Sequence, residues 1–253
     1  MRRFLINSPV VRLCLYPAAA FAVGLALSPL SSFAQAEQAE TKGDPYPLAT
    51  CPVAGAELGS MGDPVVHVHE GREVRFCCAG CAPAFEDDPD QYLQQIDEQI
   101  VEQQKEHYPL ETCLISGQEL GSMGDPVEHV LYNRLVRLCC AGCVSELEEN
   151  AEVHLAKLDE AVIEAQADDY ALDFCLVSDE PLDAHGHTID RVIANRLVRL
   201  CCPGCAAVLQ EQPATVLAAL DAGEPIEDAH EHRHDHGDDN GHDHDHGHDG
   251  HHH

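Results

Sequence analysis

Twelve cysteines form the most regular pattern in this sequence, because each recurs at a spacing of 62 residues. They fall into four columns: Cys51, Cys113 and Cys175; Cys77, Cys139 and Cys201; Cys78, Cys140 and Cys202; Cys81, Cys143 and Cys205. Thiolate sulfur suits soft or borderline ions, among which Zn²⁺ and Cu⁺ are the leading candidates. All twelve cysteines are therefore candidate metal ligands, four in each of three tandem repeats.

Three of the four cysteines in each repeat lie within a Cys-Cys-x-Gly-Cys string, which begins at Cys77 in the first repeat. Two thiolates three or four positions apart can point at one ion. The intervening Gly80 lets the backbone turn tightly and direct amide N–H groups at the sulfurs. Cys51, from an earlier turn, can close the site from the other side. A unit this small would gain much of its folding free energy from the bound metal.

Disulfide bonds are the first alternative use of these thiols. An exported protein meets an oxidising compartment, and four cysteines per repeat is an even number. A disulfide-stabilised scaffold or interaction protein would then bind metal only through other residues. Against this interpretation, a bond between the adjacent Cys77 and Cys78 would be strained, so each would need a different partner.

Thiol–disulfide oxidoreductase activity is the second alternative, because Cys78 and Cys81 have the C-x-x-C spacing. The repeats lack a thioredoxin-like βαβ pattern, however, and three copies of one active site would be unusual. The sequence shows no nucleotide-binding loop, no Gly-x-Ser-x-Gly motif and no coherent acid–base pair. We therefore expect a protein that is not an enzyme. Haem attachment is excluded because the required histidine is replaced by Ala82, Val144 and Ala206.

Histidines are concentrated in the C-terminal segment 229–253, which has almost no apolar residues and is predicted to be disordered. Its candidate ligands are His230, His232, His234, His236, His242, His244, His246, His248, His251, His252 and His253. Neutral imidazoles beside carboxylates suit Zn²⁺, Ni²⁺, Co²⁺ and Cu²⁺. Acid should weaken this binding as the imidazoles protonate, near an unperturbed pKa of about 6.5.

A few further residues have side chains that can bind metal. Met61, Met123 and His185 share one column of the repeat, and thioether and imidazole both bind copper. His67 and His129 share another column, and we expect both to lie on the surface of a strand. One shared column is weak support for a ligand role in either set.

Each repeat predicts the same local elements around its cysteines. In the second repeat the strands of a β-hairpin are expected at about 127–131 and 135–138. Gly71, Asn133 and Asn195 share the column where each hairpin must turn, and these residue types tolerate the positive φ of tight hairpin turns.

A helix should follow each hairpin. In the first repeat it is expected to begin near Asp88-Pro89, an N-cap followed by proline at the first helical position. Apolar residues then recur at helical spacing, at Leu93, Ile96 and Ile100. We expect this apolar stripe to pack on the hairpin of its own repeat. In the third repeat the pattern ends at Gly223.

The first 36 residues are typical of an export signal. Arg2 and Arg3 precede a mostly apolar stretch, and Ala34-Gln35-Ala36 is a small-residue cleavage site. We therefore expect a periplasmic or secreted protein with no stable membrane insertion after cleavage. Losing three arginines and no acids would shift the net charge from −31 to −34, which disfavours nucleic-acid partners.

The stretch from Arg75 to Leu93, with Phe85 and Tyr92 after the knuckle, resembles the YHS and TRASH families of small metal-binding domains. The resemblance implies three treble-clef-like folds that handle, sense or resist heavy metals, with a metal transporter or sensor as a conceivable partner. By position it implies three ligands per repeat, in the columns that begin at Cys51, Cys77 and Cys81. The extra column that begins at Cys78 would supply a fourth ligand or bind a second ion.

The sequence thus predicts an α+β protein of tandem modules with a metal-sequestering, buffering or trafficking role. The expected segments are a signal peptide at 1–36, a linker at 37–45, repeats at 46–107, 108–169 and 170–228, and the metal-binding tail at 229–253.

Overall fold

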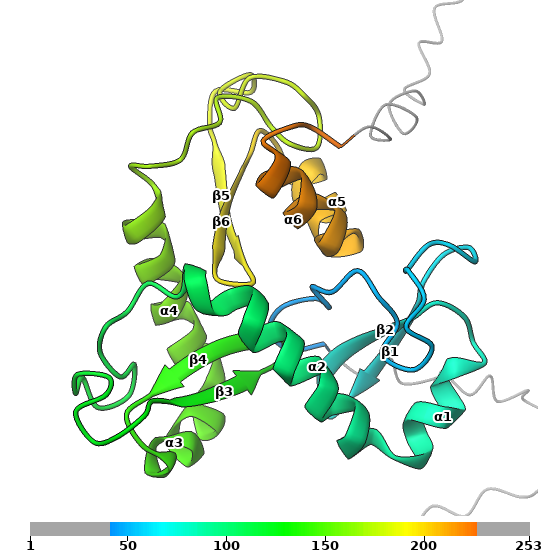
Figure 1. The fold of residues 1–253 in the computed structure, drawn as a ribbon. Coiled ribbons are helices and arrows are strands. Elements are labelled where there is room, and N and C mark those ends of the chain that lie inside the picture. Colours follow the sequence, from blue (N-terminus) through cyan, green and yellow to red (C-terminus); the bar gives the residue numbers. More distant parts are fainter. Residues whose placement is uncertain (1–40, 227–253) are drawn as a thin grey trace, which may run out of the picture. The chain divides into compact units, whose positions relative to one another are not determined.

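The computed structural model describes residues 41–226, so the predicted signal peptide and the histidine-rich tail lie outside the described residues. The described part combines small antiparallel hairpins with helices, which confirms the α+β class (Figure 1). Its elements, in chain order, are β1 Val65–His69, β2 Arg72–Phe76, α1 Cys81–Asp87, α2 Pro89–Gln104, η1 Lys105–His107, β3 Val127–Leu131, β4 Arg134–Leu138, η2 Ala141–Cys143, α3 Val144–Glu149, α4 Ala151–Gln166, β5 Ile189–Ile193, β6 Arg196–Leu200, α5 Pro203–Glu211 and α6 Pro213–Ala222.

The three hairpins, β1–β2, β3–β4 and β5–β6, have the same register, so that Val65 faces Phe76 and Val127 faces Leu138. Both central residues of each two-residue turn have positive φ. In the second hairpin these are Tyr132 at 47° and Asn133 at 69°, and in the third the second central residue is Asn195 at 58°. Gly71 occupies the same position with φ 90°. The predicted turn column is confirmed, because such turns match the right-handed twist of the flanking strands.

Helix α2 begins at Pro89, as predicted, and the side chain of Asp88 accepts a hydrogen bond from the Gln91 amide at 3.4 Å. A proline also restricts the residue before it to extended conformations. Asp88 has φ −150° and ψ 71°, outside the helical region, and it separates α2 from a short helix that the sequence did not predict. This helix, α1, begins at Cys81, so the last cysteine of the knuckle lies in its first turn.

Each repeat has its own apolar core, and that core includes its buried cysteines. In the first repeat Phe76 of β2, Phe85 of α1, and Ile96 and Ile100 of α2 are fully buried in one cluster. The buried residues of α2 therefore join the core of their own repeat, as predicted, but the helix also contacts β3 and β4 of the next repeat. In the described range 41–226, no helix is both long and apolar enough to cross a membrane.

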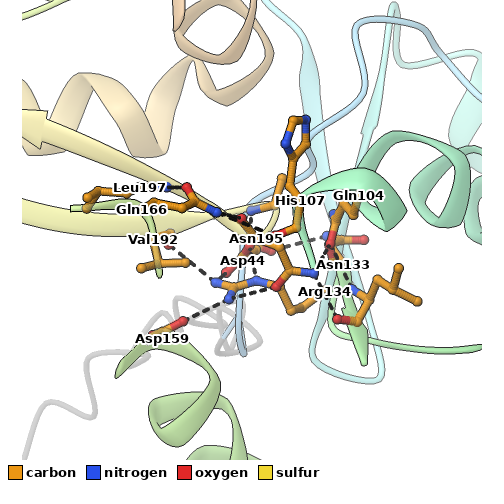
Figure 2. Close-up of polar contacts among 12 residues, drawn as sticks. Asp44, Gln104, His107, Asn133, Arg134, Asp159, Gln166, Val192, Asn195 and Leu197 are labelled. Carbon is orange, nitrogen blue, oxygen red and sulfur yellow. Dashed lines mark hydrogen bonds and ion pairs between the residues drawn. The ribbon is translucent and has the colours of Figure 1, made fainter. Parts of the chain in front are cut away.

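Polar side chains at the ends of the long helices join each repeat to the next one. The Gln104 amide donates to the Asn133 carbonyl at 2.9 Å, and its oxygen accepts from the Leu135 amide at 2.8 Å. One repeat later, Gln166 makes the same two bonds, at 2.9 and 2.8 Å, to Asn195 and Leu197 (Figure 2). These contacts fix where each hairpin turn lies relative to the preceding helix.

A buried network at the hairpin turns includes Asp44, which falls in the predicted linker. The guanidinium of Arg134 donates to both carboxylate oxygens of Asp44, and the Ala194 amide donates to Oδ2 at 2.7 Å (Figure 2). Arg75, in the first repeat, donates to the carbonyls of Gln210 and Glu211 at the end of α5. Segments from all three repeats therefore contact one another through buried polar groups.

Candidate metal centre

Three cysteines converge in each repeat, and their sulfur atoms all lie within 4.8 Å of one another. All nine side chains are buried. The three triads are Cys51, Cys77 and Cys81; Cys113, Cys139 and Cys143; Cys175, Cys201 and Cys205. Three thiols gathered in this way, away from water, are a donor set that could hold one thiophilic ion.

Three different local structures bring the first triad together. Cys51 lies in a tight turn, in which its amide donates to the Ala56 carbonyl at 2.8 Å and its carbonyl accepts from Gly55 at 2.8 Å. Cys77 directly follows strand β2, and Cys81 begins helix α1. The Cys81 amide donates to the Cys78 carbonyl at 3.2 Å and closes the turn between strand and helix. The other triads form from the same columns, but Cys143 ends the 3-10 helix η2 and Cys205 is the third residue of α5.

The fourth column of cysteines lies beside the triads but outside them. The Sγ atoms of Cys78 and Cys81 are 3.8 Å apart, and those of Cys202 and Cys205 are 3.4 Å apart. Cys140 lies in the same place in the second repeat, 4.0 Å from Cys143. These three side chains are only half-buried, and all twelve cysteines of the described residues are free. The structure thus brings together the three columns that the family resemblance implied as ligands, and it leaves the extra fourth thiol more accessible.

One thiol of each triad has a pKa below that of an ordinary cysteine. Burial opposes ionisation of Cys51, but the backbone amides of Ala54, Cys77 and Val53 lower its pKa. Burial also raises the pKa of Cys113, but hydrogen bonds, chiefly from the hydroxyl and the amide of Ser116, lower it further. The net result is a pKa of about 6.

The corresponding thiol of the third repeat shows the strongest effect. The thiol of Cys205 donates a hydrogen bond to Cys175. This bond lowers the pKa of Cys175 more than burial raises it, and the pKa falls to about 4.

The neighbouring thiols show the opposite effect. Burial and donation to the other sulfurs raise the pKa of Cys81 and of Cys143 to about 12. Donation to Cys175, followed by burial, raises the pKa of Cys205. In each triad without metal, one thiol therefore ionises more readily than an ordinary cysteine, while a neighbouring thiol ionises less readily. A bound cation would compensate the charge of the remaining thiolates, which is the condition for all three to ionise.

Hydroxyl groups distinguish the second and third triads from the first. Ser116 Oγ lies 3.3 Å from Cys139 Sγ, and Ser178 Oγ lies 3.2 Å from Cys201 Sγ. The first repeat has Ala54 in this column. A hydroxyl beside a ligating sulfur tunes its basicity, so the triads are not identical sites. The sequence shows that Ser116 and Ser178 share a column of the repeat, but only the structure shows that their hydroxyls lie beside a cysteine sulfur.

Four of the remaining candidate ligands, two histidines and two methionines, lie outside the cysteine triads. His67 packs against the ring of Phe85 with centroids 5.5 Å apart, and His129 lies 3.4 Å from a glutamate. Both lie on strands, in β1 and β3, with partly exposed side chains, and neither belongs to a group of three His, Cys, Asp or Glu donors among the described residues. Met61 and Met123 are 58% and 61% exposed.

His185, which occupies the column of Met61 and Met123 in the third repeat, lies beside two cysteines. The imidazole of His185 lies with the sulfurs of Cys201 and Cys202, and these donor atoms are within 4.8 Å of one another. The tail histidines from His230 to His253 lie outside the described residues.

Comparison with known proteins does not identify a relative of this chain. No protein-family model matches it, and neither a curated protein nor a solved structure does. The resemblance to the YHS and TRASH families therefore depends on the sequence motif alone, that is, on the cysteine spacing and the residues around it. The site must be interpreted from its own geometry.

Proposed function

We propose that this protein binds soft or borderline metal ions and sequesters, buffers or traffics them outside the cytoplasm. The observation that carries this proposal is the threefold recurrence of a buried cysteine triad with its sulfurs within 4.8 Å. Zn²⁺ or Cu⁺ is the proposed cargo of the triads, because thiolate ligands favour both ions. Each repeat is proposed to be a YHS/TRASH-like module of the treble-clef type.

A binding role, rather than catalysis, is supported by the position of the triads. Their thiols are enclosed in apolar cores, such as the cluster that joins Cys51 to Phe76 and Phe85. A redox-active or nucleophilic cysteine needs access to its substrate, whereas a structural or storage site for a cation is best closed. The more accessible Cys78 is adjacent to this site, where it can serve as a further ligand or as a position for ligand exchange.

The tail and the leader complete the proposed function. Imidazoles and carboxylates in 229–253 would collect ions with high capacity and modest affinity, and the triads would hold them tightly. A signal peptide at 1–36 would direct the protein to the periplasm or the exterior. A metal transporter or sensor is the kind of protein partner that this role implies.

Metal content and free thiols, measured on one sample, test the proposal. The protein is purified from the periplasm without chelator, and thiols are counted before and after chelation. Three thiolate-bound ions per chain, with thiols that react only after chelation, are expected from the three triads. Because the tail contains no cysteine, thiolate-to-metal charge-transfer absorption separates its ions from those of the triads.

The same measurement identifies the alternatives. Protein without metal and without free thiols, even after unfolding, would mean six disulfides among the twelve cysteines of the repeats. The tail would then be the sole basis for metal binding. Free thiols without metal affinity, together with insulin-reduction activity, would indicate an oxidoreductase.

A further inference from the structure

The third repeat has a second donor set that the other two lack. The imidazole of His185 and the sulfurs of Cys201 and Cys202 lie within 4.8 Å of one another. In the first and second repeats the same column holds Met61 and Met123, and no corresponding group of His, Cys, Asp or Glu forms there among the described residues. One imidazole with two thiolates is a mixed set that suits borderline ions such as Zn²⁺ and Co²⁺.

This second set overlaps the buried triad, because Cys201 belongs to both groups. The donors also differ in exposure. The side chain of His185 is 50% exposed, Cys202 is half-buried, and Cys201 is fully buried. The two groups therefore form a continuous series of donors from solvent to the interior, in which consecutive sulfurs are close enough for one ion to change ligands.

A carboxylate is positioned beside the exposed imidazole. His185 Nε2 lies 3.4 Å from Oε2 of Glu180, which follows the turn that begins at Cys175. Metal-binding histidines commonly donate their other ring nitrogen to such a group, which orients the ring and increases its basicity. The loop that carries His185 is held by a bond of 2.8 Å from the Gly186 amide to the Asp183 carbonyl.

The last described residue lies beside the third triad. Ile226 is the last described residue, and its amide donates to the Leu176 carbonyl at 2.8 Å. Leu176 directly follows Cys175 of the triad. The chain therefore leaves the described structure beside the third metal centre, and the first histidine of the tail, His230, is only four residues further along.

We propose that His185, Cys201 and Cys202 form an accessory metal site through which ions reach the third triad. The inference rests on the proposed function, since it requires that the triads bind metal. An incoming divalent ion first binds the imidazole and the two thiolates. It then exchanges His185 and Cys202 for Cys175 and Cys205 while it remains bound to Cys201. Each thiol that becomes a ligand releases its proton to solvent, and no electron is transferred.

Rapid mixing of the reduced, metal-free full chain with Co²⁺ tests this proposal. Thiolate-to-cobalt charge transfer reports the cysteine sites alone, because the tail contains no cysteine. In the wild type, one of the three triads should load in a distinct fast phase. His185→Met introduces the residue type of the other two repeats. It should slow that phase by about tenfold or more, the scale on which supporting groups of metal sites act.

The matched control is His187→Met, which removes another exposed imidazole from the same loop. It should leave the fast phase unchanged, and both variants should reach the wild-type charge-transfer amplitude. Identical kinetics for wild type and His185→Met, or equal slowing by both variants, would overturn the accessory site while the triads still bind. A wild type without any thiolate-to-cobalt band would instead refute the proposed function itself.

Discussion

Arg134 holds Asp44 with two hydrogen bonds, from Nε to Oδ2 at 2.8 Å and from Nη2 to Oδ1 at 2.7 Å. Both side chains are buried, and they join the N-terminal segment to the hairpin of the second repeat. Asp159 accepts a third bond from Arg134 at 2.8 Å. The small cores that hold the candidate metal centres are thus joined by a charged network in which Arg134 and Asp44 are buried.

Asp44→Asn should therefore weaken the fold strongly. The change keeps the volume but leaves Arg134 with only one carboxylate. We expect the free energy of unfolding to fall by about 3 kcal/mol, the low end for a broken buried pair, because Asp159 remains. Chemical denaturation of the reduced, metal-free protein measures the change. Asp221→Asn is the control, since this aspartate pairs with Arg196 but its side chain is 65% exposed.

The control should cost only about 0–1 kcal/mol, as surface pairs do. Equal losses in Asp44→Asn and Asp221→Asn would show that burial of the Arg134 network contributes nothing.

Gln104→Ala should separate the second hairpin from the preceding helix. Truncation leaves the Leu135 amide and the Asn133 carbonyl without their partners in a buried environment. A buried group without its hydrogen bond costs about 1–3 kcal/mol, so the loss of unfolding free energy should lie at or above that range. Thermal and chemical denaturation measure it. Gln103→Ala, on the exposed face of the same helix, should change stability by no more than about 0.5 kcal/mol.

Cys81→Ser should remove one thiolate-bound ion per chain, because Cys81 belongs to the first triad. Cys78→Ser should retain that ion, because Cys78 lies outside the triad although its sulfur is 3.8 Å from that of Cys81. Serine keeps the shape of the side chain but replaces a soft ligand by a hard one. Metal content after equilibrium dialysis gives the answer. Loss of the ion in both variants would mean a centre with four ligands.

In the metal-free protein, acid should protonate the thiolate of Cys113 before that of Cys175. Without metal, the pKa of Cys113 is about 6 and that of Cys175 about 4. Both values lie below that of an ordinary thiol, so each thiolate persists as the pH falls until its own pKa is reached. All three sulfurs of a triad ionise when they bind an ion, so protons compete with the metal at each of them and acid should release it.

Thiolate absorbance of the metal-free protein should show steps near pH 6 and pH 4, which Cys113→Ser and Cys175→Ser remove in turn. A single titration near the ordinary thiol value would contradict the proposed electrostatics of the triads.

Ending the chain at Ile226 should reduce metal capacity without affecting the triads. The deletion removes eleven histidines and no cysteine. Calorimetry should show loss of the weak class of sites, whose binding declines as imidazoles protonate near pH about 6.5. Thiolate-to-metal absorbance should be unchanged. Unchanged total uptake would remove the collecting role from the tail.

The sequence alone determined the features that depend on near neighbours. The 62-residue spacing located every candidate cysteine, and Gly71 and Asn133 marked two-residue turns that the structure confirms. Asp88 and Pro89 fixed the start of a helix. Each of these features follows from the conformational preference of one or two residues, so a local pattern is sufficient to predict it.

Tertiary structure decided which of these residues meet. Folding selected three cysteines of each four as a buried triad and placed His185 beside Cys201 in the third repeat alone. It also gave Asn133 a second role, since its amide donates at 2.9 Å to the Glu73 carbonyl of the preceding repeat. Such contacts join segments about 60 residues apart, and their cost in chain entropy is offset only when complementary groups are buried together. No local pattern encodes that condition.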